Sequence, residues 1–389
     1  MKYNAKKCIA IIFIGVLLVF GLLTSGKVFF NILLDKPAVL TFDEIDSLFN
    51  DDVFLKEGLI NYNGGVRNIL QQRIIRDADA SNMIIKAGDG SLTSFMWEYD
   101  TKPRAQSVIA LRDFLAKQDI PLLYIQAPYK VIEGYTQLPT GITDYSNADT
   151  DLFLSVLDEG VVDYIDLRQE AVADKLEPKE MFFRTDHHWS TKTAFWAFTK
   201  VANLMADNYG FEFNKDYLNL DQFTVSSYPQ SFLGSEGRRV GRFYAGLDDY
   251  DFIAPNFATD ISVNIYKENG EVRSQEGDFT EAITFAPLMD MTAAPSTNHY
   301  ACYFGGDYPS VIIKNHNLHN GKILIVKDSF SLPFVAFLST VTEEINMIDL
   351  RYFTKESLTD YIDEYQPDMV MILYNPSSLS GQQMFAFGV

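Results

Sequence analysis

The chain has 389 residues, which is long enough for one large domain or two domains with full hydrophobic cores. Hydrophobic residues make up 47% of it and aromatic residues 14%, which is typical of a folded globular protein. The formal net charge of −20 argues against nucleic-acid binding, because no basic surface is left for phosphates. The only two cysteines, Cys8 and Cys302, predict no disulfide framework.

A membrane segment is predicted at the N-terminus. Lys2, Lys6 and Lys7 precede a nearly unbroken apolar run from Cys8 to Leu23. The run is sufficient for a membrane span of about 17–20 residues. Lysines before it predict a cytoplasmic N-terminus and an extracytoplasmic remainder. The alternative is a cleaved signal peptide, whose apolar core is usually about 7–15 residues long.

In both interpretations, residues 1–27 are the anchor or signal segment and the rest of the chain is exported. Residues 28–54 are expected to form a juxtamembrane segment, and residues 55–389 one folded domain. Helical patterns alternate there with short apolar runs, which is typical of an α/β fold with a central parallel sheet. The alternation is lost at 208–320, where we expect a β-rich insertion. The predicted strands are 121–128, 161–166, 322–327, 345–350 and 369–374, and the predicted helices are 103–115, 152–157, 191–205, 332–338 and 356–365.

One short motif places a carboxylate beside two of the five histidines. Asp186 and His188 are separated by one residue, so the carboxylate can reach the imidazole ring within one loop. A histidine oriented by a carboxylate can act as the base that activates a serine hydroxyl. Ser329 is the candidate nucleophile, because it follows a predicted strand at a strand-to-helix turn.

Groups that could stabilise an oxyanion are expected at the same edge of the sheet. Ligands of open parallel sheets bind beyond the carboxyl ends of the strands, where Ser329 and Asn375 both lie. The helix N-terminus after Ser329 favours negative charge. The backbone amide of Ser329 or Phe330 and the side chain of Asn375 are therefore candidate donors.

Two other interpretations of the histidine pair stay open at this point. The histidines could be structural, or could bind a metal together with Asp186. Neighbouring side chains on an extended segment face opposite ways, so we expect His187 to point away from His188 and expect no metal. The remaining histidines available to a metal are His299, His316 and His319.

The segment Arg184-Thr185-Asp186-His187-His188-Trp189 resembles the signature of the DHHW protein family. That family is similar to the alginate O-acetyltransferases of the AlgJ/AlgX type, which have SGNH-hydrolase-like catalytic domains. Further blocks at 127–130, 321–331, 349–352 and 373–375 extend the resemblance over roughly residues 55–389. It implies a three-layer SGNH-like domain whose motifs are circularly permuted, with Asp-x-His before Ser.

The resemblance implies a role for each residue of the motif. Ser329 is the expected nucleophile, His188 the base and Asp186 the acid that orients it. The chain departs from the SGNH pattern at Lys327, where that pattern has glycine, and at Pro376, which follows Asn375. These departures affect the oxyanion donors more than the triad.

Four further residues are expected to bind substrate or to support the site. Lys130 is expected to bind a carboxylate or to support the site, and Arg184 to contact an anionic glycan. Tyr303 is expected to line the pocket. Trp189 is expected to pack behind the loop, with sugar stacking as the alternative. Three more arginines are candidates for the glycan contact: Arg238, Arg239 and Arg242.

The expected function is that of a single-pass, membrane-anchored O-acetyltransferase acting outside the cytoplasm on a polysaccharide or another cell-envelope glycan. It needs no cofactor. The resemblance implies a multi-pass membrane acyltransferase as the partner that supplies acetyl groups. Two alternatives stay open: a glycan acetyl esterase with the same triad, and a non-catalytic glycan-binding scaffold.

Overall fold

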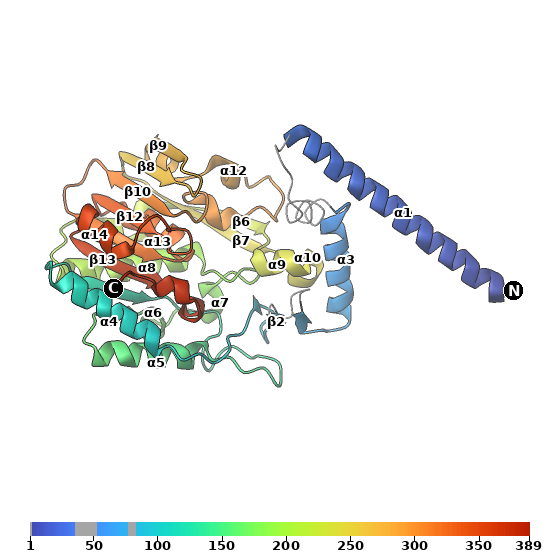
Figure 1. Ribbon diagram of the computed structural model, residues 1–389, viewed down its shortest axis with the longest axis horizontal. Coiled ribbons are helices and arrows are strands. Elements are labelled where there is room, and N and C mark those ends of the chain that lie inside the picture. The colour runs from blue at the N-terminus through green and yellow to red at the C-terminus, as the bar shows by residue number, and fades with distance from the viewer. Residues whose placement is uncertain (1, 36–52, 77–82) are drawn as a thin grey trace.

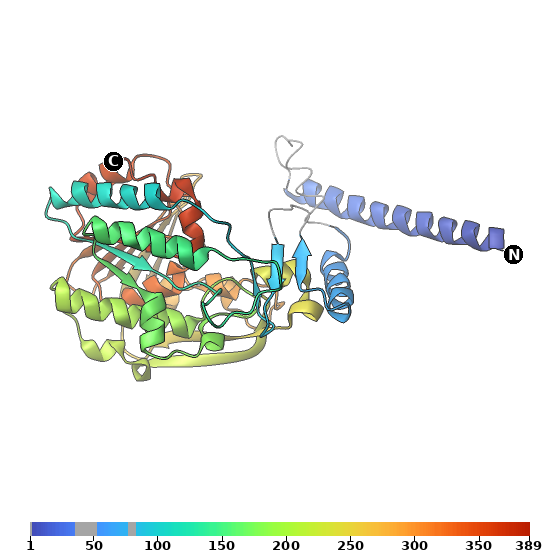
Figure 2. The same ribbon diagram turned by 90° about the horizontal axis from the view of Figure 1, so that it is seen from below.

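A computed structural model describes residues 2–35, 53–76 and 83–389, so most of the predicted juxtamembrane segment lies outside the described residues. Helix α1 (Lys2–Asp35) extends away from the rest of the protein in both views (Figures 1 and 2). Its 25-residue stretch Lys6–Phe30 is long and apolar enough to cross a membrane. The helix continues past the expected boundary at residue 27, because the sequence from Val28 to Leu34 is also largely apolar.

The centre of the protein is an eight-stranded sheet with the order β5-β4-β13-β11-β12-β10-β8-β9. The strands from β5 to β12 pair in parallel, and the last three join antiparallel at one edge. The parallel strands are β5 (Tyr164–Asp166), β4 (Leu122–Gln126), β13 (Met369–Tyr374), β11 (Lys322–Lys327) and β12 (Glu344–Ile348). The antiparallel strands are β10 (Ser310–Asn315), β8 (Ile261–Tyr266) and β9 (Val272–Gly277).

Two helical layers cover the sheet because the side chains of its buried strands alternate between the two faces. Ile323 and Ile325 of β11 pack against one set of helices, whereas Leu324 and Val326 pack against the other. Helices α8 (Thr191–Asn208) and α13 (Ser331–Leu338) cover the first face; α4 (Lys102–Ala116), α5 (Ser146–Glu159) and α14 (Leu358–Tyr365) cover the second (Figure 2). The predicted three-layer α/β fold with a mostly parallel sheet is therefore confirmed.

The region predicted as a β-rich insertion, 208–320, contains two different structures. Strands β8, β9 and β10 extend the central sheet, so this part completes the α/β core. Strands β6 (Phe223–Phe232) and β7 (Asp248–Pro255) form a separate antiparallel pair. Helices α9 (Ser235–Val240) and α10 (Arg242–Ala245) connect these two strands.

A second, smaller sheet lies on the side of the protein that faces α1 (Figure 1). It consists of β1 (Ile74–Arg76), β2 (Met83–Lys86) and β3 (Leu92–Thr93), and it shares a small apolar core with α9 and α10. Helix α3 (Lys56–Ile69) packs on α9 and α10. The connections contain α6 (Leu167–Ala173), α7 (Pro178–Met181), α11 (Phe279–Ile283), α12 (Ala286–Met289) and the 3-10 turns Lys215–Leu218, Leu220–Gln222, His299–Cys302, Pro376–Ser380 and Gln382–Phe385.

Candidate active site

Ser329 lies two residues beyond the end of β11, in the turn that leads into α13. The carboxylate of Asp328 accepts a hydrogen bond from the Phe330 amide at 2.9 Å, which closes this turn. Two side chains from other parts of the chain donate to the Phe330 carbonyl, namely Trp189 Nε1 at 3.0 Å and the Tyr300 hydroxyl at 3.2 Å. The serine is therefore held on an ordered turn at the carboxyl edge of the sheet.

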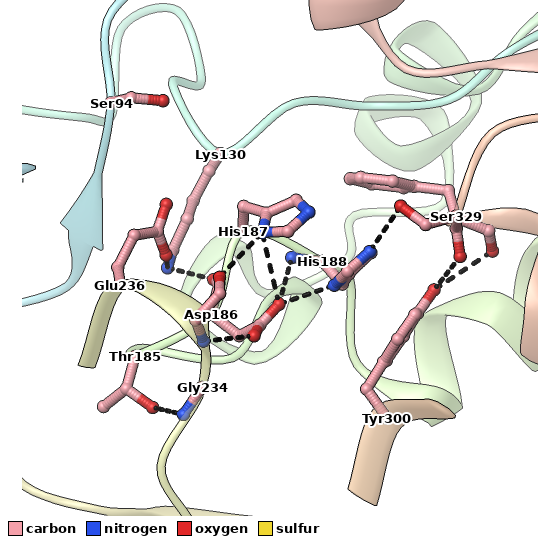
Figure 3. Close-up of polar contacts among 12 residues, drawn as sticks. Ser94, Lys130, Thr185, Asp186, His187, His188, Gly234, Glu236, Tyr300 and Ser329 are labelled. Atoms are coloured by element: carbon pink, nitrogen blue, oxygen red, sulfur yellow. Dashed lines mark hydrogen bonds and ion pairs between the residues drawn. The ribbon is translucent and has the colours of Figure 1, made fainter. Parts of the chain in front are cut away.

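The side chains of Ser329, His188 and Asp186 form one continuous hydrogen-bonded chain (Figure 3). His188 Nε2 lies 2.7 Å from Ser329 Oγ, and His188 Nδ1 lies 2.6 Å from Asp186 Oδ1. Asp186 and His188 are buried, whereas Ser329 is partly exposed. This is the geometry in which an imidazole can take the proton of a hydroxyl while a carboxylate stabilises the resulting cation.

The loop that carries Asp186 and His188 is anchored at both of its ends. An isolated β-bridge joins Phe182 to Trp189, and Asp186 accepts hydrogen bonds from the His188 amide at 3.0 Å and from the Ser235 amide at 2.6 Å. Burial by itself raises the pKa of Asp186, but His188 and these donors hold that pKa well below its usual value. Asp186 is thus kept ionised, as an orienting carboxylate requires.

Asp248, at the start of β7, fixes the residues just before Asp186, and the motif alone did not indicate it. Its carboxylate accepts the amide hydrogens of Arg184 at 2.8 Å and Thr185 at 2.7 Å, and also the Thr185 hydroxyl. Thr185 Oγ1 in turn accepts a hydrogen bond from the Gly234 amide at 2.7 Å (Figure 3). The β6–β7 pair and the turn before α9 therefore hold the loop at 184–189, called the DHHW loop below, on the side of Thr185.

Lys130 supports the same loop from the opposite direction. Its ammonium group is buried and donates to the carbonyls of Arg184 at 3.1 Å and Asp186 at 2.5 Å. It also lies 3.8 Å from the carboxylate of Glu236 (Figure 3). Of the two roles predicted for Lys130, these contacts favour support of the site over binding of a substrate carboxylate.

Asn375 is placed beside the serine turn, at the end of β13. Its backbone and side-chain amides both donate to Asp328 Oδ2 at 2.7 Å, and Ser378 Oγ donates to the same oxygen at 2.8 Å. Burial raises the pKa of Asp328, and these donors oppose the shift. Asn375 therefore helps to hold the residue next to Ser329. The Phe330 amide, predicted as one candidate oxyanion donor, is already bonded to Asp328.

Lys327, which stands where the SGNH pattern has glycine, takes part in a buried network of charges. Lys327 is almost fully buried and forms ion pairs with Asp307 and, at 3.1 Å, with Asp349, which follows β12. Arg351 pairs with the same two carboxylates. These charges link the ends of neighbouring strands, and they hold the pKa of Asp307 below its usual value although burial opposes this.

Tyr300 is a site residue that the sequence did not reveal. Its ring stacks on the imidazole of His188, with centroids 3.8 Å apart and planes 14° from parallel. Its hydroxyl donates to the Ser329 carbonyl at 3.0 Å (Figure 3). The expectation that Tyr303 lines the pocket is wrong, because Tyr303 is fully buried and its hydroxyl bonds the backbone of Ile253.

Trp189 and Arg184 differ in their distance from the chemistry. Trp189 is fully buried against Phe330, so it packs behind the loop and offers no surface to a sugar. Arg184 is exposed beside a hollow of about 330 Å³, which it lines together with Asp89 and Lys130. Ser329, His188 and Asp186 do not line this hollow. Glycan binding by Arg184 would therefore take place outside the immediate surroundings of Ser329.

His187 lies beside His188, contrary to the expectation that the two side chains face opposite ways. Their ring centroids are 3.8 Å apart, because the segment bends here and is not an extended strand. His187 Nδ1 lies 2.8 Å from Ser235 Oγ. Partial desolvation and the neighbouring imidazole lower the pKa of His187, whose side chain is still 41% exposed.

The arrangement of ligand atoms bears on whether this motif binds a metal. Among the described residues, Asp186, His187 and His188 form a group whose ligand atoms lie within 4.8 Å of one another, and the other histidines do not join it. Both nitrogens of His188 already have hydrogen-bond partners in Ser329 and Asp186. The donor set therefore fits an acid–base pair better than a metal site.

Two family models match parts of the chain. The model of the DHHW protein family matches residues 173–348, and that of the SGNH hydrolase-like domain of the acetyltransferase AlgX matches residues 97–233. No curated protein sequence matches the chain.

Solved structures share the fold. Bacillus cereus PatB1 with a sulfonyl adduct is 22% identical with a TM-score of 0.66, and the alignment covers 81% of this chain and 98% of PatB1. A second PatB1 structure is 24% identical with a TM-score of 0.63, covering 78% and 99%. A DHHW family protein from Eubacterium siraeum is 18% identical with a TM-score of 0.59, covering 81% and 96%. The resemblance predicted from the sequence is thus confirmed: the chain resembles the DHHW proteins over residues 173–348 and the SGNH hydrolase-like domain of AlgX over residues 97–233.

Proposed function

We propose that the protein is an O-acetyltransferase that acts through an acetyl-serine intermediate on a polysaccharide or another cell-envelope glycan. The observation that carries this proposal is the hydrogen-bonded chain from Ser329 through His188 to Asp186. The match to a domain of the acetyltransferase AlgX supports acetyl transfer as the reaction class.

In the first half of the proposed reaction, Ser329 Oγ attacks the carbonyl carbon of an acetyl donor. His188 Nε2 takes the serine proton and passes it to the leaving group as the tetrahedral intermediate collapses. Asp186 stabilises the imidazolium form of His188 while it exists. The Ser329 amide and the second hydrogen of the Asn375 amide are the proposed donors to the oxyanion.

In the second half, a sugar hydroxyl of the acceptor gives its proton to His188 and attacks the acetyl-serine. Collapse of this intermediate releases the acetylated sugar and returns the proton to Ser329. Water can replace the sugar hydroxyl in this step, so an acetyl esterase is the alternative function of the same triad. Product analysis with and without acceptor oligosaccharide distinguishes the two.

The proposal is tested by incubating the full chain in detergent with 4-nitrophenyl acetate. We expect release of 4-nitrophenol and a protein mass increased by one acetyl group, both abolished in Ser329→Ala. Ser331→Ala is the matched control, because Ser331 is buried two residues further on, at the start of α13, and its hydroxyl has no hydrogen bond within the described part of the chain. Acetyl turnover that persists in Ser329→Ala rejects the mechanism and favours a non-catalytic scaffold.

The proposed location is the outer face of a cell membrane, with α1 as the single span and the N-terminus in the cytoplasm. The apolar stretch Lys6–Phe30 and the lysines before it support this orientation. An acetyl donor outside the cytoplasm has to be supplied across the membrane, so a multi-pass membrane acyltransferase is the proposed partner.

A further inference from the structure

A cleft of about 420 Å³ opens beside the triad, next to His187. Its lining combines aromatic and apolar side chains with hydroxyl groups and two charged residues. In Figure 3, Ser94 and Glu236, which line this cleft, lie on the far side of the histidine pair from Ser329. The mechanism proposed above uses none of the aromatic residues of this cleft.

The aromatic wall comes from segment 95–99, which lies in the connection between β3 and α4. Trp97 is 59% exposed and Tyr99 is 37% exposed. The ring of Phe95 meets that of Trp97 edge to face, with centroids 4.8 Å apart. An indole ring that is exposed on one side and supported on another offers a stacking surface within a cleft.

The backbone of this segment is held in place from the neighbouring loop and from α5. The Met96 amide donates to Asp144 at 2.7 Å, and the Met96 carbonyl accepts from the Tyr145 amide at 3.1 Å. The Tyr99 amide donates to Asp149 at 3.1 Å. The aromatic wall is thus preorganised, so that less entropy is lost when a ligand stacks on it.

Two other lining residues connect the cleft to the proposed reacting groups. His187 lines the cleft, and its ring lies 3.8 Å from that of His188. Ser377 also lines the cleft and donates to Asn375, which in turn binds the residue preceding Ser329. Ser329, His188 and Asp186 do not themselves line the cleft; it adjoins them through His187 and Ser377, and a ligand extending from Trp97 past these two residues would reach the serine turn.

We propose that this cleft is the acceptor site and that a pyranose ring of the acceptor glycan stacks on Trp97, an inference that rests on the proposed function. A pyranose has apolar C–H faces and a rim of hydroxyl groups, which match an aromatic wall surrounded by polar side chains. Ser94, Ser235 and Ser377 also line the cleft and carry hydroxyl groups that can meet the sugar hydroxyls. Glu236 Oε2, buried in the lining, has no hydrogen bond within the described residues. The stacked sugar positions a neighbouring sugar's hydroxyl for attack on the acetyl-serine.

Binding is measured by calorimetry with the full chain in detergent, in the Ser329→Ala background so that no turnover occurs. The probes are chitotetraose, which is neutral, and tetragalacturonate, which carries a carboxylate on each sugar. We expect at least one probe to bind, Trp97→Ala to weaken that binding about tenfold, and Trp97→Phe to restore part of it. Tyr62→Ala on α3 is the control, because Tyr62 is 72% exposed and does not line the cleft.

A second measurement separates this inference from the proposed function. In the otherwise wild-type protein, we expect Trp97→Ala to raise the KM for the acceptor about tenfold. The rate of acetyl-serine formation from 4-nitrophenyl acetate should change much less, because that step does not involve the acceptor. If neither probe binds, or if Trp97→Ala leaves binding within twofold, the acceptor site is rejected even where acetyl-serine forms. If acetyl-serine never forms, the proposed function fails, whereas the binding measurement still decides whether sugars occupy the cleft.

Discussion

His188 is contacted on three sides, and each contact has a different physical effect. Asp186 fixes the orientation of the imidazole through Nδ1, the Ser329 hydroxyl forms a hydrogen bond with Nε2, and Tyr300 covers one ring face. The Tyr300 hydroxyl also ties the Ser329 carbonyl to the same support. One aromatic residue thus links the His188 ring to the backbone of Ser329.

Tyr300→Phe is expected to lower kcat for acetyl-ester turnover about fivefold. The ring remains on His188, but the hydrogen bonds to the Ser329 and Phe330 carbonyls are lost. This loss should raise the activation free energy by about 1 kcal/mol. Steady-state kinetics check this, with Tyr303→Phe as the matched control, since its buried hydroxyl also bonds backbone but at Ile253. An equal loss of kcat in both variants would show that the effect is general destabilisation and not positioning.

Glu236 is expected to make stability depend on pH. Burial raises the pKa of its carboxyl to about 8, although Lys130 opposes the shift. Because the folded state holds this proton more tightly than the unfolded state, stability falls as the pH rises from about 4.5 to about 8. The free energy of unfolding of Glu236→Gln should therefore rise, relative to that of the wild type, by up to about 1.4 kcal/mol for each pH unit in that window. Urea unfolding at several pH values tests this; a constant difference between the two proteins contradicts it.

At the scale of elements, the site depends on a close contact between the DHHW loop and the turn that precedes α9. The Ser235 amide binds Asp186, and the Gly234 amide binds Thr185. A Cβ atom at Gly234 would clash with the Cα and Cβ atoms of Asp186. The glycine is needed for this close approach and not for its backbone angles, since its φ is −68°.

Gly234→Ala is therefore expected to displace Asp186 and to lower acetyl turnover about 100-fold. It should also destabilise the protein by about 1–3 kcal/mol, because the added methyl group overpacks a buried contact. Turnover and urea unfolding are measured together, with Gly58→Ala in α3 as the control, where the nearest atom to a new Cβ is 3.9 Å away. Normal activity in Gly234→Ala would mean that the loop tolerates movement of Asp186.

At the scale of the whole molecule, the roles proposed for α1 and for the α/β body are separate. The apolar side chains of α1 are largely exposed, whereas those of the sheet and its helices are buried. The triad lies at the carboxyl edge of the sheet, on elements that do not include α1. Membrane attachment and chemistry are therefore expected to be separable.

Deleting residues 2–35 is expected to release the protein from membranes while leaving acetyl-ester turnover within about twofold of the full chain. The physical reason is that the deleted helix contributes none of the hydrogen bonds that hold the triad. Membrane fractionation and kinetics of the purified protein measure the two properties. A truncated protein that is folded but inactive would show that α1 contributes to the site.

Much of the core was predictable because its signals are local. The apolar runs at 322–327 and 369–374 predicted β11 and β13, since a buried parallel strand is apolar on both faces. The strand-like pieces within 208–320 did not reveal that β8, β9 and β10 join the sheet. Antiparallel pairing at an edge depends on partners that are distant in the sequence.

The sequence by itself determined the α/β class, the apolar N-terminal segment and the pairing of Asp186-x-His188 with Ser329 as candidates, because each is recorded in a local pattern or family motif. Only the tertiary structure decided that Tyr300 and not Tyr303 contacts the site, that Asp248 holds the loop, and that Trp97 lines a cleft beside it. These relations arise where segments far apart in the chain pack together. Burial and contact there depend on the whole fold, which no local pattern encodes.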